Sequence, residues 1–295
     1  MSNSLSALRN LEHLAKFLCR KRAAVFANAP RVPLPLLQNA FTTSRQKNFG
    51  LAKWFSWILL GPDWDYALLG YSYVKCVDYV VDDDVDSERA LAFLHRQREL
   101  LEESYAGPID RELPSPDNYG QAIFVQDANN GSPLRSCFED VLDTMEVDVR
   151  RRNQILSADE LDAHFVKTGT PGTRYLCRFA SPCMRLPSTY LALSSCAYLW
   201  ADSLIDVKYD LEHGIVNIPA EDIARFGLTP APSDAGLRPW MEERSAIVMQ
   251  QFREALSETD RLTDSSIIFY FRRYLIDKRK RLCRFLKHEG IAIQG

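Results

Sequence analysis

Aspartates four residues apart occur in two separate, otherwise apolar stretches of the sequence. Asp78 and Asp82 form the first row, and Asp202, Asp206 and Asp210 form the second. This spacing puts the side chains on one face of an α-helix, about 40° apart. Carboxylate rows that face each other across helices suit Mg²⁺, a hard ion that keeps waters and bridges phosphate oxygens. The spacing therefore indicates a metal–diphosphate site.

A simpler interpretation stays open for each row. A single pair of aspartates at this spacing is usually a solvated helix face, where like charges cost a few tenths of a kcal/mol. The run from Asp82 to Asp84 also suits a helix end followed by an N-cap. Two rows beside apolar residues favour the metal site, because burying uncompensated carboxylates is costly.

Basic residues cluster near the C-terminus, at Arg272-Arg273 and from Lys278 to Arg281. This run is either a solvated or acid-paired helix face, or a cation patch that binds a diphosphate. The cluster from Arg150 to Arg152 is better explained as a charged helix C-terminus.

Composition and missing motifs exclude several other classes. The 295 residues carry a net charge of −3, so no basic field points to a nucleic-acid partner. The sequence has no HExxH zinc motif and no glycine-rich dinucleotide or P-loop motif. Its seven cysteines form no CxxC pair, which favours a reducing, cytoplasmic location.

The elements that carry these residues are predicted to be helices, and the fold class all-α. We find apolar residues at helical spacing and no long alternation of β-branched residues. Asp86 and the box Ser157–Glu160 have the pattern of helix N-termini. Turn-rich breaks are expected over 107–116, 127–133 and 227–239. Helices are predicted at Leu68–Val81, 88–105, Phe138–Arg152, after Ser157, and at Ser188–Leu211, Met241–Glu258 and Ser265–Leu286.

A single domain over residues 1–295 is expected, with residues 1–44 as an N-terminal helical extension. The N-terminus does not look like an export signal. Gly61-Pro62-Asp63 interrupts the longest apolar segment, so we expect no membrane span and a soluble cytoplasmic protein. Contact with a membrane surface stays open.

Two segments resemble the motifs of the squalene/phytoene synthase family. Residues 71–83 (YSYVKCVDYVVDD) are similar to its first motif, YxYCRxxDDxxDE. Residues 202–219 (DSLIDVKYDLEHGIVNIP) are similar to its second, NxxRDxxxDxxxGRxYxP. The resemblance covers roughly residues 45–230, with both motifs in the family's order.

The resemblance implies an all-α isoprenoid-synthase bundle whose two aspartate helices face each other across a central cavity. It implies that Mg²⁺ helps an allylic prenyl diphosphate to ionise, and that a carbon nucleophile captures the cation in an apolar pocket. The implied metal ligands are Asp78, Asp82, Asp202, Asp206 and Asp210. The implied substrate contacts are Tyr71, Lys75, Arg273 and Tyr274, and the pocket lining could include Tyr71, Tyr73, Tyr198 and Trp200.

The sequence departs from the family pattern where groups associated with a second diphosphate are expected. Lys75 and Ile205 stand at arginine positions, and Tyr79 stands at an aspartate position. Asp202 replaces an asparagine, and Ile215 and Asn217 replace an arginine and a tyrosine. These losses predict an enzyme that uses one diphosphate and an electron-rich acceptor, similar to bacterial carbazole prenyltransferases of secondary metabolism. Head-to-head condensation of two prenyl diphosphates, and a non-catalytic partner protein, stay open as alternatives.

Overall fold

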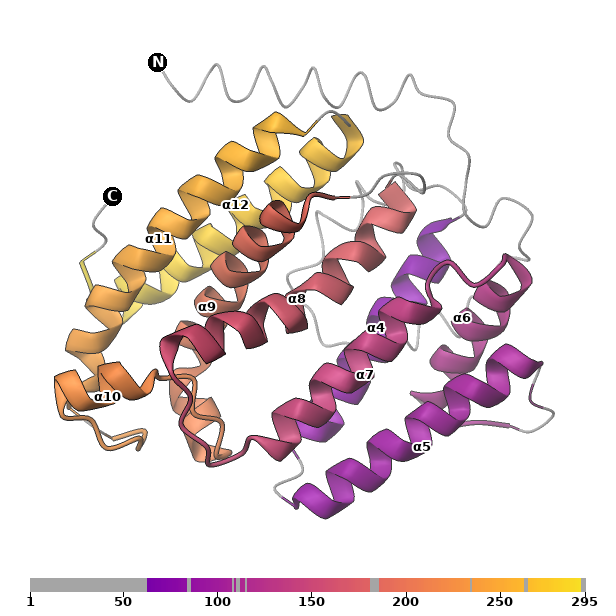
Figure 1. Ribbon diagram of the computed structural model, residues 1–295, viewed down its shortest axis with the longest axis horizontal. Helices are drawn as coiled ribbons and strands as arrows, with labels where there is room; N and C mark the ends of the chain where they lie inside the picture. Colours follow the sequence, from indigo (N-terminus) through magenta and orange to yellow (C-terminus); the bar gives the residue numbers. More distant parts are fainter. Residues whose placement is uncertain are drawn as a thin grey trace. The chain divides into compact units, whose positions relative to one another are not determined.

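The computed structural model describes residues 63–83, 86–107, 109, 112–114, 116–180, 186–233, 235–262 and 265–292. Within these ranges the secondary structure is helical, with no strand, which confirms the predicted all-α class (Figure 1). The helices are α4 (Asp63–Asp83), α5 (Ser87–Ala106), α6 (Asp117–Asn129), α7 (Arg135–Arg150), α8 (Ala158–Ala180), α9 (Ser188–Glu212), α10 (Ala220–Phe226), α11 (Leu237–Arg261) and α12 (Ser265–His288).

The described chain divides into two compact units, and the division falls within α8. The α4 unit comprises residues 63–150 and 174–180, and the α9 unit comprises residues 151–173 and 186–292. The expectation of a single domain stays a prediction. The expected N-terminal extension, residues 1–44, lies outside the described residues.

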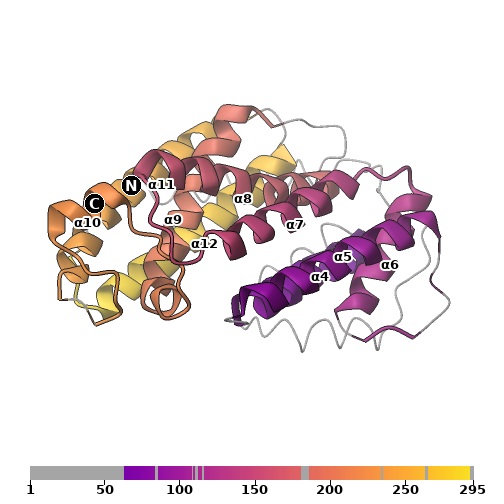
Figure 2. The same ribbon diagram turned by 60° about the horizontal axis from the view of Figure 1, so that its bottom comes forward.

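In the α4 unit, α4 packs against α5, α6 and α7 (Figure 2). Tyr73 of α4 is fully buried, with its ring edge-on to Phe124 of α6 at 5.0 Å. Phe124 in turn lies edge-on to Phe138 of α7 at 4.9 Å. Aromatic pairs in this geometry add to the stabilisation from apolar burial. This cluster fixes the buried side of the helix that carries the first aspartate row.

The C-terminal part of α8 is also tied to α4. The Tyr175 hydroxyl donates to the carbonyl oxygens of Tyr66 and Ala67, at 3.2 and 3.0 Å. Gly70 makes this approach feasible, because a Cβ there would lie 2.2 Å from the same hydroxyl oxygen. A larger residue at position 70 would therefore displace Tyr175.

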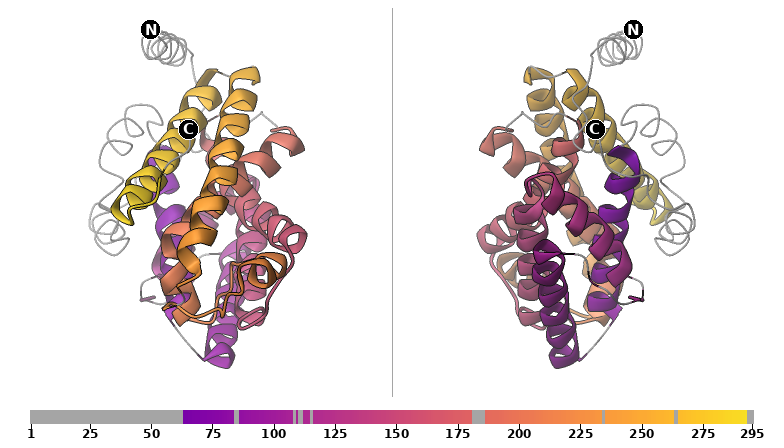
Figure 3. Two further views of the ribbon diagram at one scale, coloured as in Figure 1. Left: turned by 90° about the vertical axis from the view of Figure 1, so that its left-hand side faces the viewer. Right: turned by 90° about the vertical axis from the view of Figure 1, so that its right-hand side faces the viewer.

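In the α9 unit, α9 packs against both α11 and α12. Figure 3 (left) shows α11 and α12, orange and yellow, running alongside each other. Trp200 of α9, Trp240 of α11 and Leu275 of α12 are all buried in one apolar core. This core buries one face of α9. The three aspartates of the helix, Asp202, Asp206 and Asp210, are only partly buried.

Two predicted helix starts are confirmed by their hydrogen bonds. The Asp86 carboxylate accepts from the backbone N–H groups of Glu88 and Arg89, at 3.0 and 3.5 Å. Ser157 and Glu160 form the reciprocal capping box, in which the Glu160 carboxylate accepts from the Ser157 backbone N–H at 2.8 Å. Both satisfy donors that the first helical turn leaves unpaired.

Two predictions of element boundaries were incomplete. The loop expected over 227–239 ends earlier, because α11 begins at Leu237 and contains Pro239. A first-turn proline breaks no helical hydrogen bond, since its missing N–H would be unpaired there anyway. Helix α6 was not predicted at all. It contains Gly120, whose Cα lies so close to Tyr73 that a Cβ would be 2.8 Å from that ring, so packing rather than propensity supports it.

None of the described helices is long and apolar enough to cross a membrane.

Candidate active site

The first aspartate row lies on α4, with Asp78 and Asp82 both partly buried. Lys75, one turn earlier, donates from Nζ to Asp78 Oδ2 at 2.6 Å. Tyr71 is partly buried on the same helix, whereas Tyr79 is 56% exposed. Helix α4 therefore carries four predicted site residues, and one of them, Lys75, supplies a cation beside the row.

The second row lies on α9, where Asp202, Asp206 and Asp210 are each partly buried. Neighbouring α9 residues such as Leu204 and Val207 are buried in the core. The aspartates of the second row therefore lie beside the apolar core, within the apolar stretch of sequence that carries them. Their positions beside low-dielectric core make nearby cations energetically important.

Two such cations come from α12. Lys278 Nζ lies 2.5 Å from Asp202 Oδ2, and both side chains are mostly buried, 21% and 26% exposed. Arg281 lies 3.8 Å from Asp202 Oδ1 and 4.0 Å from Asp206 Oδ1. Lys278 and Arg281 of the basic run are therefore paired with acids, and binding of a diphosphate by the run stays a prediction. Their partners are the carboxylates of the second row.

Two tyrosines surround the Lys278 ammonium. Its nitrogen lies 5.8 Å from the ring centroid of Tyr198 and 5.7 Å from that of Tyr274. The two rings pack edge-on with centroids 5.4 Å apart. Both nitrogen–ring distances are within the range of cation–π attraction. Asp202 and the two rings therefore restrict where the ammonium can lie.

Asp210 is held by a polar chain after the end of α9. Asn217 Nδ2 donates to Asp210 Oδ2 at 3.0 Å, and Asn217 Oδ1 accepts from Arg151 Nη2 at 3.0 Å. The turn between them needs Gly214, which has φ +74° and whose Cβ would lie 2.7 Å from Asn153 Oδ1. Asn217 is thus engaged in orienting the last carboxylate of the row.

The remaining predicted substrate contacts lie on α12. Arg273 is exposed, and its Nε lies 3.0 Å from Asp277 of the same helix. Tyr274 is partly buried beside Tyr198 and Lys278. Contact of either residue with a diphosphate stays a prediction. Sequence reasoning missed the specific pairs Lys278–Asp202 and Asn217–Asp210, although the unusual Asp202 was a signal that a cation should lie nearby.

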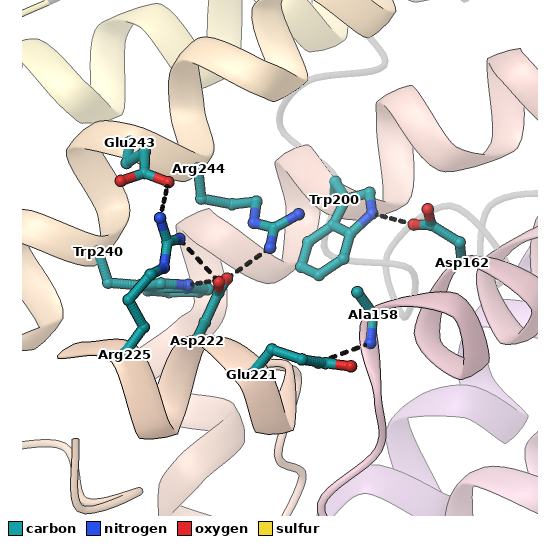
Figure 4. Close-up of polar contacts among 9 residues, drawn as sticks. All are labelled: Ala158, Asp162, Trp200, Glu221, Asp222, Arg225, Trp240, Glu243 and Arg244. Carbon is teal, nitrogen blue, oxygen red and sulfur yellow. Dashed lines mark hydrogen bonds and ion pairs between the residues drawn. The ribbon is translucent and has the colours of Figure 1, made fainter. Parts of the chain in front are cut away.

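A buried network fixes the helices around the second row (Figure 4). Asp222 of α10 accepts hydrogen bonds from Trp240 at 2.9 Å, from Arg225 at 2.8 Å and from Arg244. Burial opposes ionisation of Asp222, but the bonds from Arg244 and Trp240 outweigh it and hold its pKa below the ordinary 3.8. The Asp222 carboxylate is therefore charged at neutral pH.

The same network reaches α9 itself. The Arg244 guanidinium lies 4.6 Å from the ring centroid of Trp200, and Trp200 Nε1 donates to Asp162 Oδ1 at 2.6 Å. Figure 4 shows Trp200 between these two residues. Trp200 is only 1% exposed, so its observed role is to pack and orient α9 rather than to line an open pocket.

The donor set partly fits a divalent metal. Carboxylate oxygens are the ligands that Mg²⁺ prefers. Among the described residues, however, no three acidic, histidine or cysteine side chains gather at one point. One row lies in the α4 unit and the other in the α9 unit. The expected facing arrangement of the two rows stays a prediction.

Comparisons with known proteins agree with the motifs. The sequence profile of the squalene/phytoene synthase family matches residues 64–272. The crystal structure of squalene synthase HpnC from Alicyclobacillus acidocaldarius is similar in fold, with a TM-score of 0.65 and 17% identity, over 89% of this chain and 98% of that one.

A dehydrosqualene synthase crystallised with a ligand also matches, with a TM-score of 0.55 and 17% identity, over 87% of this chain and 100% of that one. No curated protein sequence matches the chain. The structural likenesses show a shared fold, and the profile covers most of the chain, including both aspartate rows. The chain therefore belongs to the squalene/phytoene synthase family.

Proposed function

We propose that this protein is a Mg²⁺-dependent prenyltransferase that ionises one allylic prenyl diphosphate and transfers the prenyl group to a carbon of an electron-rich aromatic acceptor, such as a carbazole, in secondary metabolism. Family membership supports an enzyme of prenyl diphosphate chemistry. The observation that carries the proposal is the pairing of each aspartate row with a cationic side chain, at Lys75–Asp78 and Lys278–Asp202.

The proposed roles follow from residue chemistry. Mg²⁺ would be held by Asp78, Asp82, Asp206 and Asp210, and when bound it supplies Lewis-acid neutralisation of the departing diphosphate. Lys75, Arg273, Tyr71 and Tyr274 would contact the substrate. The fifth predicted ligand, Asp202, is paired with Lys278, and its role is considered separately below.

The use of a single diphosphate is supported by what replaces the family's additional polar groups. Ile205 and Ile215 are apolar and offer no hydrogen bond to an anion. Asn217 already bonds to Asp210 and Arg151. An uncharged acceptor requires no second anion site. An aromatic acceptor is suited to attack an allylic cation, because its π electrons are the nucleophile.

Head-to-head condensation is the second candidate. The two structures of similar fold are described as a squalene synthase and a dehydrosqualene synthase. In that reaction the only organic substrate would be the prenyl diphosphate. The product would be a hydrocarbon with twice the prenyl chain length.

The test measures diphosphate release from dimethylallyl, geranyl, farnesyl and geranylgeranyl diphosphates, with and without hydroxylated aromatics and carbazoles. We expect release that depends on Mg²⁺ and rises when an aromatic is added, with a gain of one prenyl mass on that aromatic. A dimeric hydrocarbon formed without acceptor would instead establish the second candidate. Failure to release diphosphate from any substrate would support a non-catalytic partner protein.

A further inference from the structure

We infer that Lys278, held by Asp202, is a built-in cation at the second aspartate row, so that Asp202 positions an ammonium group for the diphosphate rather than binding a metal. The inference rests on the proposed function, because it assigns a diphosphate as the anion. It changes the role of one residue that the family motif would make a metal ligand.

The charge at position 202 differs from that in the family motif. Family members are expected to have a neutral asparagine at position 202, whereas this chain has an aspartate. An added carboxylate at the edge of an apolar core is costly unless a cation compensates it. Lys278 Nζ lies 2.5 Å from Asp202 Oδ2 and supplies that compensation directly.

The Lys278 ammonium is restrained on three sides, by Asp202 and by the rings of Tyr198 and Tyr274. An ammonium has three donors, so its hydrogen bond to Asp202 leaves two N–H groups that an anion can accept. Asp202 Oδ1 is buried without a hydrogen-bond partner, and Arg281 Nη1 lies 3.8 Å from it. Lys278 and Arg281 together therefore present two positive groups beside the row.

A metal ligated by Asp202 would have to displace Lys278 from Oδ2 and would lie next to two positive charges. Repulsion between like charges at these distances opposes such binding. In this assignment the metal ligands of the row are Asp206 and Asp210, one and two helical turns further along α9.

The experiment uses a charge-neutral double variant, Asp202→Ala with Lys278→Met, in the full chain. Its matched control is Glu212→Ala with Lys287→Met, which removes one exposed acid from α9 and one exposed lysine from α12. Circular dichroism melting of both variants checks that they fold. The first readout is calorimetric binding of inorganic pyrophosphate in a chelator, without metal.

We expect the Asp202/Lys278 variant to bind pyrophosphate about tenfold more weakly, as for loss of one charged hydrogen bond, and the control to match the wild type. The second readout is binding of Mn²⁺ alone. We expect wild-type Mn²⁺ affinity in both variants, since neither removes a metal ligand.

Unchanged pyrophosphate binding in the Asp202/Lys278 variant would overturn the inference, as would a tenfold loss of Mn²⁺ affinity. These readouts do not depend on turnover. If the wild type released no diphosphate from any allylic substrate, yet still bound pyrophosphate through Lys278, the proposed function would fail while the cation site stood.

Discussion

The two aspartate rows differ in where their positive charge comes from. On α4, Lys75 pairs with Asp78 three residues away, and the lysine side chain is 42% exposed. On α9, Asp202 pairs with Lys278, which is 76 residues away in sequence and only 21% exposed. The first pair is local and solvated, whereas the second depends on the packing of α12 against α9.

This difference has an energetic consequence. An exposed pair on one helix contributes a few tenths of a kcal/mol, because water screens it and both side chains stay mobile. A partly buried pair between two helices is screened less, and the tyrosine rings restrain its lysine. We therefore expect the α9 row to be the more preorganised half of the anion-binding machinery.

The largest effect is expected when a carboxylate of either row is removed. Asp206→Ala and Asp78→Ala should each lower diphosphate release by about a thousandfold, since each removes charge that acts directly on the reacting group. Glu212→Ala, an exposed acid on α9, is the matched control and should keep full activity. Wild-type turnover by Asp206→Ala would show that the α9 row has no catalytic role.

A second prediction concerns the network that fixes the α9 row. Asp222→Asn should lower the free energy of unfolding by about 3 kcal/mol at neutral pH, because it leaves Arg244 without its buried partner. Chemical denaturation measures this loss. Glu221→Gln, at the more exposed neighbouring acid, should cost less than about 1 kcal/mol.

The pH dependence of Asp222 follows from its lowered pKa. Because the folded pKa lies below the unfolded value, this contribution is fully present above pH 3.8 and is lost as the pH falls through the folded pKa. The wild-type advantage over Asp222→Asn should therefore shrink as the pH falls below 3.8. An advantage that stayed constant with pH would mean that the ion pair is not its source.

A third prediction compares the two lysines directly. Lys278→Met should reduce kcat/KM for the allylic diphosphate by about tenfold, and Lys75→Met by about threefold, following the difference between a restrained and a solvated charge. Steady-state kinetics at fixed Mg²⁺ measures both. Equal losses, or a larger loss at Lys75, would contradict the proposed asymmetry of the rows.

The smallest effect is expected at the buried acid of the α4 unit. Asp127 accepts hydrogen bonds from the Tyr105 hydroxyl at 2.6 Å and the Leu134 backbone N–H at 3.0 Å. Burial raises the pKa of Asp127 above the ordinary 3.8, the opposite direction from Asp222. Asp127→Asn keeps an acceptor oxygen and should change the free energy of unfolding at neutral pH by about 1 kcal/mol.

The pKa of Asp127 is shifted in the opposite direction from that of Asp222, so the two variants should respond to pH in opposite ways. Because the pKa of Asp127 is raised in the folded state, Asp127 contributes less to the free energy of unfolding as the pH rises from 3.8 through that pKa. Stability of Asp127→Asn relative to wild type should therefore improve as the pH rises from 3.8. A relative stability that fell over that range would contradict the assigned direction.

The sequence predicted local features well. The Asp86 cap, the Ser157–Glu160 box and the apolar stretch of α4 follow from residue spacing within one or two helical turns. The spacing of Lys75 and Asp78 likewise allows their pairing on one helix. Interactions of this range are set by helix geometry, which a short segment determines alone.

Long-range features could not be obtained in the same way. The pairing of Lys278 with Asp202 depends on how α12 packs on α9, and Asn217 joins Arg151 to Asp210 across 66 residues. Helix α6 was missed because tertiary packing against Tyr73 supports a segment of weak intrinsic propensity. The basic run was recognised, but its partners depend on the tertiary fold.

The proposed reaction consumes one prenyl diphosphate for each molecule of product. The most direct measurement counts diphosphate released against product formed, by mass spectrometry, with farnesyl diphosphate and a carbazole as substrates. We expect one diphosphate to be released for each prenylated aromatic molecule. Two diphosphates released for each hydrocarbon molecule, with the carbazole recovered unchanged, would contradict it.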